Sequence, residues 1–262
     1  MRKQLLLIVL SLLVIVGGGA GIYFGVFSED PVVTSEEVPV VDGSQTGSTT
    51  DPEIVENSRP KYQGQALRFI GSDPVVKTLA AEIIAEKKVE LNKFAEIAEK
   101  NPSDSLAWLK ISEIKKFFNN YKGSVDALEY IKLTSPDDFL VNLNLGNLYG
   151  FYLKDYKRAE QNFANAMNHS GGDQLVAAIS ALADLYKDFY KEKYDQVDDL
   201  LLIGIEAIPS DVNLVMKLAF YYKEVNNKEG AIQSFERLLS MPGLTGAQQQ
   251  AFEAEIAALK KA

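Results

Sequence analysis

The sequence predicts an all-α fold in which pairs of short helices stack side by side as a solenoid. Residues 139–171 read as two short amphipathic helices, in which small residues allow close approach and large residues fill the gaps. The same order of small, large and aromatic positions recurs before and after this stretch at intervals of 34 to 37 residues. Prolines stand where second helices are expected to end, at 136, 209 and 242.

The composition fits a globular protein and restricts its chemistry. Of 262 residues, 47% are hydrophobic and 24% are charged, which is enough for a real core. The formal net charge of -9 argues against nucleic acid as the main partner, because phosphate binding needs clustered Lys and Arg. The absence of cysteine excludes disulfides, thiolate metal sites and a cysteine nucleophile.

The amino terminus has the pattern of a retained membrane anchor. Residues 1–4 carry Arg2 and Lys3, and the apolar run 5–27 has no charge and is long enough for a helix that crosses a bilayer. The positive-inside rule places residues 1–4 in the cytoplasm and the rest of the chain outside the cell membrane. The alternative is a cleaved signal peptide and a secreted protein, with Gly18-Gly19-Ala20 as the small-residue cleavage site.

Three glycines within the apolar run share one predicted helix face. Gly17, Gly21 and Gly25 recur every fourth residue, a spacing that allows transmembrane helices to pack closely. We therefore expect the anchor to self-associate or to dock on another membrane helix, although glycine is also simply common in membrane helices.

Residues 28–60 are predicted to be a disordered acidic linker. Eight acidic residues against one basic residue leave a charge of -7, and no helical period is present. A flexible chain of this length spans roughly 30 Å on average, so it would hold the folded part away from the membrane. The acidic residues are Glu29, Asp30, Glu36, Glu37, Asp42, Asp51, Glu53 and Glu56, and the basic one is Arg59.

An N-terminal helical lead-in is expected over residues 61–104. Asp73-Pro74 has the form of a helix start, and Asn101-Pro102 ends the stretch. The apolar positions between them fit either one long helix or a degenerate helical pair. Residues 61–72 are expected to pack as an ordered segment ahead of it.

Four repeats are predicted over residues 105–245, at 105–138, 139–173, 176–210 and 212–245. The first carries Trp108, Ile111, Ser112, Tyr121, Ser124, Leu128, Ile131 and Pro136; the second Leu145, Gly146, Tyr149, Tyr156, Ala159, Phe163, Ala166 and Gly171; the third Leu182, Ala183, Tyr186, Tyr194, Val197, Leu201, Gly204 and Pro209; the fourth Leu218, Ala219, Tyr222, Ala231, Phe235, Leu238 and Pro242.

This pattern resembles the tetratricopeptide repeat (TPR) family over about residues 105 to 243. The resemblance is strongest in the second and fourth units and implies a superhelical solenoid of helix pairs. The first unit departs from the family pattern at Lys115, which replaces the usual aromatic residue. Insertions near Asp155 and Lys191 are expected to alter the local turns.

A capping helix is predicted over residues 246–262. Thr245 can cap its start, and Phe252, Ile256 and Leu259 form an apolar stripe. A solenoid needs such a cap because its last repeat otherwise exposes a core face. The alternative is a frayed amphipathic tail that binds something else.

No catalytic site, metal site or cofactor site is predicted. His169, the only histidine, stands in a predicted turn beside Ser170, and neither a positioned nucleophile nor an orienting acid accompanies it. No cluster of His or acidic residues has the spacing of a zinc site. We therefore expect a protein that is not an enzyme.

The family resemblance implies that the first helix of each pair lines a groove that receives a peptide or a helix. By register, the groove residues are Leu109, Glu113, Lys116, Leu143, Asn147, Phe151, Asp184, Lys187, Met216, Phe220 and Lys223. The Lys and Asn set with which some family members hold acidic tails is matched only at Asn147. A mixed apolar and charged groove suits an amphipathic segment, with Phe151, Met216 and Phe220 as anchors. The alternative is that these side chains pack within the solenoid.

The predicted function is that of a membrane-tethered scaffold that recruits a protein partner through its repeats. The alternative is a structural subunit that assembles with copies of itself, aided by the glycine face of the anchor.

Overall fold

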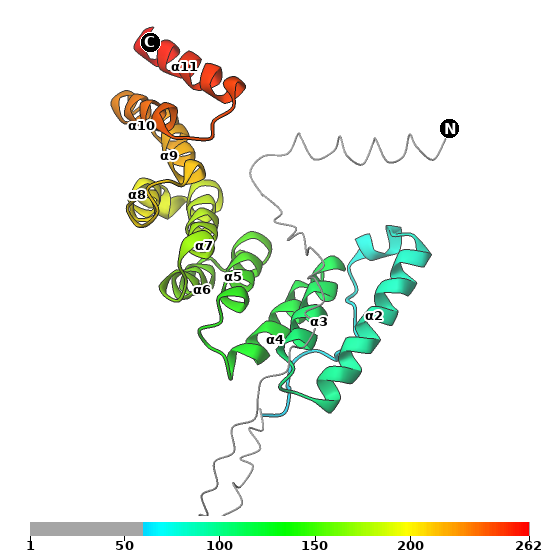
Figure 1. Ribbon diagram of the computed structural model, residues 1–262. Helices are drawn as coiled ribbons and strands as arrows, with labels where there is room; N and C mark the ends of the chain where they lie inside the picture. The colour runs from blue at the N-terminus through cyan, green and yellow to red at the C-terminus, as the bar shows by residue number, and fades with distance from the viewer. Residues whose placement is uncertain (1–59, 262) are drawn as a thin grey trace, which may run out of the picture. The chain divides into compact units, whose positions relative to one another are not determined.

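The computed structural model describes residues 60–261, in which every regular element is helical (Figure 1). The predicted all-α class is confirmed for this part of the chain. The predicted anchor and almost all of the predicted linker lie outside the described residues. Between residues 60 and 261, no helix is long and apolar enough to cross a membrane.

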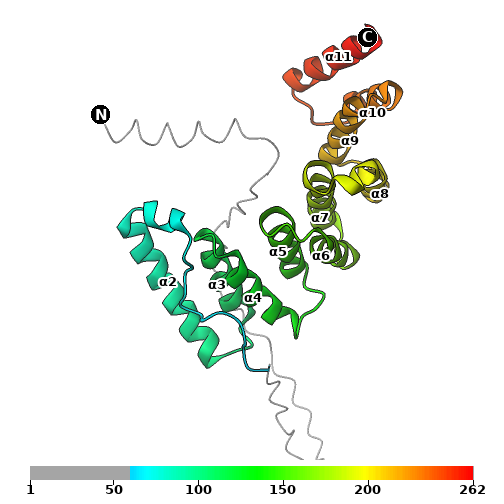
Figure 2. The same cartoon turned by 180° about the vertical axis from the view of Figure 1, so that it is seen from behind.

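The helices follow one another as hairpins from α2 to α11, and Figure 2 shows the same succession from behind. Each helix of the hairpins packs against the next along the chain. The elements are η1 (Pro74–Thr78), α2 (Ala81–Lys100), α3 (Ser105–Phe117), α4 (Tyr121–Lys132), α5 (Phe139–Asn147), η2 (Leu148–Tyr152), α6 (Tyr156–Asn168), α7 (Gly172–Asp184), η3 (Leu185–Phe189), η4 (Lys191–Gln196), α8 (Val197–Ala207), α9 (Val212–Glu224), α10 (Lys228–Ser240) and α11 (Gly246–Lys261).

Aspartate caps fix the start of three of the four first helices. Asp104, Asp138 and Asp211 each accept a hydrogen bond from the amide three residues later, at 2.9, 2.9 and 2.8 Å. An N-cap of this kind satisfies one of the free amides in the first helical turn. The fourth first helix, α7, begins at Gly172 without a side-chain cap, four residues before the predicted repeat boundary at 176.

A second recurring motif turns each first helix into its partner. One residue adopts a positive φ, and the residue after it caps the second helix by accepting from the amide three residues later. The pairs are Asn119–Asn120, Lys154–Asp155 and Asn226–Asn227. The third hairpin lacks this motif and instead carries the 3₁₀ helix η4, at the insertion expected near Lys191.

The insertion expected near Asp155 is absorbed by a π-helical turn. In the first and fourth units the capping residue comes nine positions after the leucine or isoleucine of the repeat pattern, as Asn120 follows Ile111 and Asn227 follows Leu218. In the second unit Asp155 comes ten positions after Leu145. The additional residue widens the end of α5 into η2, where the amide of Leu153 donates to the carbonyl of Leu148 at 2.9 Å. The hairpin can therefore close with its partner helix in register.

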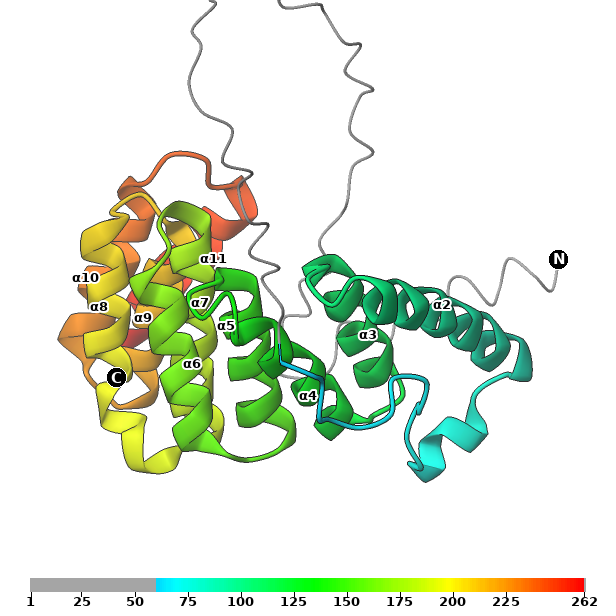
Figure 3. The same cartoon turned by 90° about the horizontal axis from the view of Figure 1, so that it is seen from below.

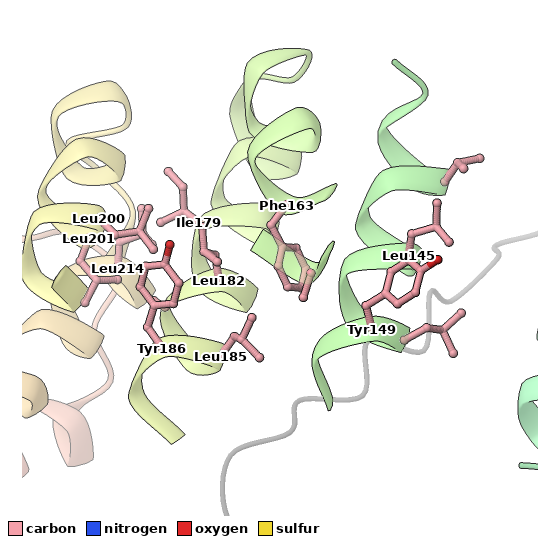
Figure 4. Packing of buried hydrophobic residues seen from close by; sticks show 14 of the residues in the cluster. Leu145, Tyr149, Phe163, Ile179, Leu182, Leu185, Tyr186, Leu200, Leu201 and Leu214 are labelled. Atoms are coloured by element: carbon pink, nitrogen blue, oxygen red, sulfur yellow. The ribbon is translucent and has the colours of Figure 1, made fainter. Parts of the chain in front are cut away.

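The core runs through the interior of the stack, where large side chains such as Leu145, Phe163 and Ile179 lie between the helices (Figure 4). Phe163 of α6 is fully buried and lies over Gly146 of α5. A Cβ atom at position 146 would lie 2.7 Å from two carbons of this ring. The glycine is therefore required by the close approach of the two helices rather than by its backbone conformation.

The predicted lead-in, residues 61–104, contains a short 3₁₀ helix followed by a separate α-helix rather than one long helix. Asp73 caps only the short 3₁₀ helix η1, and α2 begins eight residues after Asp73, at Ala81. Asp73 and Pro74 thus begin a helical turn, as predicted, but not the long helix, and Ile83 of α2 is exposed. α2 packs on α3, and Figure 3 shows it lying at a steep angle to the helices from α5 to α10.

Residues 60–72, which we call the strap, cover the start of the stack. Tyr62 packs against Trp108 and Tyr130, with ring centres 4.8 and 5.4 Å away. Lys115, fully buried, donates from Nζ to the carbonyls of Ala66 and Phe69 at 3.0 and 3.1 Å. The lysine that departs from the aromatic pattern thus fastens the strap by its backbone.

The last helix, α11, closes the other end. The side chains of Thr245 and Gln248 form a reciprocal capping box, with Gln248 accepting from the amide of Thr245 at 2.9 Å. Phe252 and Ile256 are buried, and the ring of Phe252 lies 5.8 Å from that of Phe235 in α10. This helix covers the apolar face that α10 would otherwise expose.

We predict that Gly146→Ala destabilises the fold by about 1–2 kcal/mol, because overpacking against Phe163 outweighs the better helix propensity of alanine. The control is Gly246→Ala in α11, where a Cβ atom meets nothing within 4 Å. Urea unfolding of a fragment spanning residues 58–262, followed by circular dichroism, gives both free energies. Equal stability of the two variants would contradict the close-packing argument.

We also predict that Lys115 makes stability rise with pH between about 8 and 9.5. Burial lowers its pKa to about 8, with the charge of Asp126 opposing the shift. The unfolded chain keeps an ordinary lysine pKa, so it binds more protons than the folded chain in this window, and raising the pH favours folding.

The measurement compares the free energy of unfolding at the two pH values for the wild-type fragment and for Lys115→Met. The wild type should gain about 1–2 kcal/mol relative to the variant. An identical pH dependence of the two proteins would mean that Lys115 titrates normally.

Candidate functional site

The predicted groove residues are carried by α3, α5 with η2, α7 with η3, and α9. Side-chain contacts link these first helices from one hairpin to the next: Lys116 to Tyr152, Phe151 to Phe189, and Asp184 to Lys217. None of the eleven predicted residues belongs to the fully buried core, and Glu113, Phe220 and Lys223 are exposed. The other eight are partly buried, and four of them, Leu109, Leu143, Phe151 and Met216, pack against the core. We call the surface that carries the eleven residues the first-helix face.

The half of this face formed by α7 and α9 is occupied by ion pairs between neighbouring helices. Lys217 of α9 pairs with Asp184 of α7 at 2.5 Å, and Lys187 of η3 lies 3.4 Å from Glu224. Lys223 continues the series to Glu255 of α11 at 2.6 Å. The charged residues of this half that were predicted to meet a partner, Asp184, Lys187 and Lys223, therefore already pair within the chain.

The titration of these groups follows from their surroundings. Burial raises the pKa of Asp184, and Lys217 opposes this shift through its charge and hydrogen bond. The pKa of Glu224 is lowered, chiefly because it accepts a hydrogen bond from the Tyr194 hydroxyl at 2.8 Å, with Lys187 contributing. Burial, together with the same hydrogen bond to Glu224, raises the pKa of Tyr194 to about 12.

The half of the face formed by α3, α5 and η2 is apolar and aromatic. Leu109, Leu143 and Phe151 are half-buried and pack against the core. The Phe151 ring lies 6.5 Å from Phe163 and 5.3 Å from Phe189 of η3. Asn147, at the end of α5, is also only partly buried.

The three predicted anchors differ in how much of their surface is free. Phe220 is 43% exposed and rests edge-on against Phe235, with ring centres 5.4 Å apart. Phe151 and Met216 are partly buried and pack against the core cluster. Phe220 is therefore the anchor that offers the largest new contact area.

Four residues of this surface escaped the prediction from register, and one of them, Phe117, lies at the end of the regular helix α3. Tyr152, Lys154 and Phe189 lie at the end of the first-helix face, in or next to the π turns η2 and η3. A π turn rotates the residues after it relative to a regular helix, so a fixed repeat register misplaces them. The longer spacings of 37 and 36 residues between units were the available signal.

Other features of the described residues offer little to a small ligand. A shallow hollow of about 210 Å³ is lined by Tyr186, Gln196, Asp199, Leu200 and Ile203, and it contains no predicted groove residue. Small-molecule sites are usually larger and more enclosed. Within residues 60–261, no three His, Cys, Asp or Glu side chains gather as metal ligands do.

His169 lies at the exposed end of α6. Its Nδ1 is 2.9 Å from the carbonyl oxygen of Asn165, and its Nε2 is 3.7 Å from Asp137. Ser170 hydrogen-bonds to the backbone of Met167. This arrangement is that of a helix end, with local contacts to backbone and surface groups.

Residues 60–261 thus form a stack of helical hairpins whose first helices present one partly accessible face. No protein-family model matches the chain, and no curated protein is significantly similar to it.

We predict a favourable coupling between Asp184 and Lys217. A double-mutant cycle with Asp184→Asn and Lys217→Gln should give about 0.5–1 kcal/mol at low salt, as expected for a partly exposed pair. The coupling should shrink in about 1 M NaCl because salt screens the charges. Urea unfolding of the four proteins measures it, and a coupling of zero at low salt would show that the pair does not hold α7 to α9.

Proposed function

We propose that this chain is a non-enzymatic, membrane-tethered scaffold that binds a peptide or an amphipathic helix of a protein partner. The repeats are TPR-like, and the first-helix face of α3, α5, α7 and α9 receives the partner. The observation that carries the proposal is the accessibility of that face, where apolar and aromatic side chains lie beside charged ones without being buried in the core. Amphipathic segments bind surfaces of this mixed character.

The sequence pattern at the amino terminus supports the tether. One apolar run flanked by Arg2 and Lys3 fits an anchor with its amino terminus in the cytoplasm. The acidic residues 28–60 then connect the anchor to the hairpins outside the cell membrane. The net charge of -9 supports a protein partner over nucleic acid.

A second candidate function is self-assembly. The adjacent Leu202 and Ile203 of α8 are 44% and 56% exposed, which gives the second helices an apolar spot of their own. Together with the glycine face of Gly17, Gly21 and Gly25, this spot favours a structural subunit that meets copies of itself.

Site-specific photocrosslinking of the full-length chain in its membrane separates the two functions. A benzophenone amino acid replaces Phe151 or Phe220 on the first-helix face, and Gln161, an exposed residue of α6, serves as the control position. We expect one discrete adduct with a different protein from the first two positions and none from Gln161.

Adducts of the chain only with itself would support self-assembly instead. The same adducts from all three positions would contradict a binding face on the first helices.

A further inference from the structure

Exposed aromatic rings line the end of the first-helix face at three successive hairpins. Phe117, Tyr152 and Phe189 are 45%, 42% and 37% exposed. Neighbouring rings hold two of them in place: Tyr121 lies 4.5 Å from Tyr152, and Phe151 lies 5.3 Å from Phe189. These rings are fixed on one side and open on the other.

Lysine side chains lie over these rings. Nζ of Lys116 is 5.8 Å from the centre of the Tyr152 ring, and Nζ of Lys154 is 4.3 Å from that of Phe189. Both contacts cross from one hairpin to the next, so they join the rings and charges into one surface. We call Phe117, Tyr152, Phe189, Lys116 and Lys154 the aromatic–lysine edge.

The positive charge of this edge is not neutralised within residues 60–261. Segments 116–122 and 151–158 hold five basic residues and one acid, and that acid, Asp155, lies 3.3 Å from Arg158. The remaining lysines, at 116, 122, 154 and 157, form no ion pair with a described carboxylate. Glu113, the acid nearest in sequence to Lys116, pairs with Lys110 at 2.9 Å.

This charge contrasts with the rest of the hairpin stack. Residues 61–261 carry 24 basic and 28 acidic side chains, a net charge of -4. On the neighbouring part of the first-helix face, Lys187, Lys217 and Lys223 are all paired. Lys116 and Lys154, which lie beside exposed rings and form no ion pair among the described residues, therefore mark one end of the face as complementary to a negatively charged, partly apolar group.

We propose that the aromatic–lysine edge selects an acidic segment of the partner protein whose carboxylates alternate with aromatic or aliphatic side chains. The carboxylates pair with Lys116 and Lys154, and the apolar side chains pack on Tyr152 and Phe189. The inference rests on the proposed scaffold function and names the chemistry of its partner. Burial already lowers the pKa of Lys116, so its cation is partly stripped of water and pairs more strongly with an incoming carboxylate.

An acidic protein segment fits this surface better than a nucleic-acid phosphate backbone or a segment of carboxylates alone. Two lysines at this edge, in a chain of net charge -9, are too few for a phosphate backbone, which is bound through many clustered positive charges. The open rings add contact area that a chain of carboxylates alone would leave unused.

The test measures the binding of fluorescent peptides of about twelve residues to the full-length chain in detergent, by fluorescence anisotropy. One peptide alternates Asp and Glu with Phe and Leu, a second replaces the acids with Lys, and a third replaces Phe and Leu with Ser. We expect the first to bind most tightly, and Lys116→Gln/Lys154→Gln to weaken it by about tenfold or more.

A matched control removes the same charge elsewhere. Lys228→Gln/Lys261→Gln changes two exposed lysines of α10 and α11, neither of which forms an ion pair among the described residues, and it should leave binding within about twofold. Phe189→Ala should weaken the first peptide but not the serine peptide. Equal binding of the first peptide and the serine peptide, or equal loss in both lysine variants, would show nonspecific electrostatics and overturn the proposal.

A parallel assay uses vesicles containing phosphatidylglycerol. Vesicle binding that depends on Lys116 and Lys154, without binding of the acidic peptide, would assign the edge to a membrane surface and overturn the proposal.

The failure of this inference is distinguishable from failure of the scaffold function. If Phe151 and Phe220 still crosslink a partner when Lys116 and Lys154 are replaced, the scaffold stands and the acidic segment does not.

Discussion

The close approach of neighbouring helices is the constraint on which the rest of this structure depends. It is achieved by setting a glycine on one helix against a large side chain on the next. Gly146 lies under Phe163, and added Cβ atoms at Gly150 and Gly204 would lie 2.7 and 2.8 Å from methyl groups of Leu185 and Leu214. Because such contacts leave no room for adjustment, each hairpin fixes the position of the next. The side chains of the first-helix face are therefore placed by the core beneath them.

A stack of this kind must also be closed at both ends, and the two ends use different means. At the far end, α11 covers α10 with an ordinary apolar stripe. At the near end, the strap provides few apolar residues, and polar contacts supplement the packing of Tyr62: Asn120 reaches Gln65 at 2.9 Å, and the amide of Gln65 donates to Asp126 at 2.9 Å. A buried lysine is tolerable there because backbone carbonyls solvate its charge.

The sequence was informative wherever structure follows from local pattern. Helix pairs and the small-to-large packing positions were read from spacing alone, as Gly146 and Phe163 illustrate, whereas the caps Asp104, Asp138 and Asp211 were not predicted. Two features could not be read in this way. The strap depends on contacts such as Lys115 to Ala66, which are 49 residues apart and leave no periodic trace. The π turns η2 and η3 shift the register by a residue, so Tyr152 and Phe189 were missed although their neighbour Phe151 was included.

The first-helix face thus has two halves, which differ in whether their charged side chains form ion pairs with neighbouring helices. Between α7, α9 and α11 the carboxylates and lysines pair with each other, and a ligand would have to break those pairs before gaining new ones. Between α3 and η3 the helices meet through aromatic rings instead. Lys116 and Lys154 therefore form no ion pair with a neighbouring helix of the described stack. In the proposed function, the paired half holds the stack in shape, and the aromatic half carries specificity. The extra residue in η2 matters for this division, because it carries Tyr152 beyond the regular register and into contact with Tyr121 of the preceding hairpin.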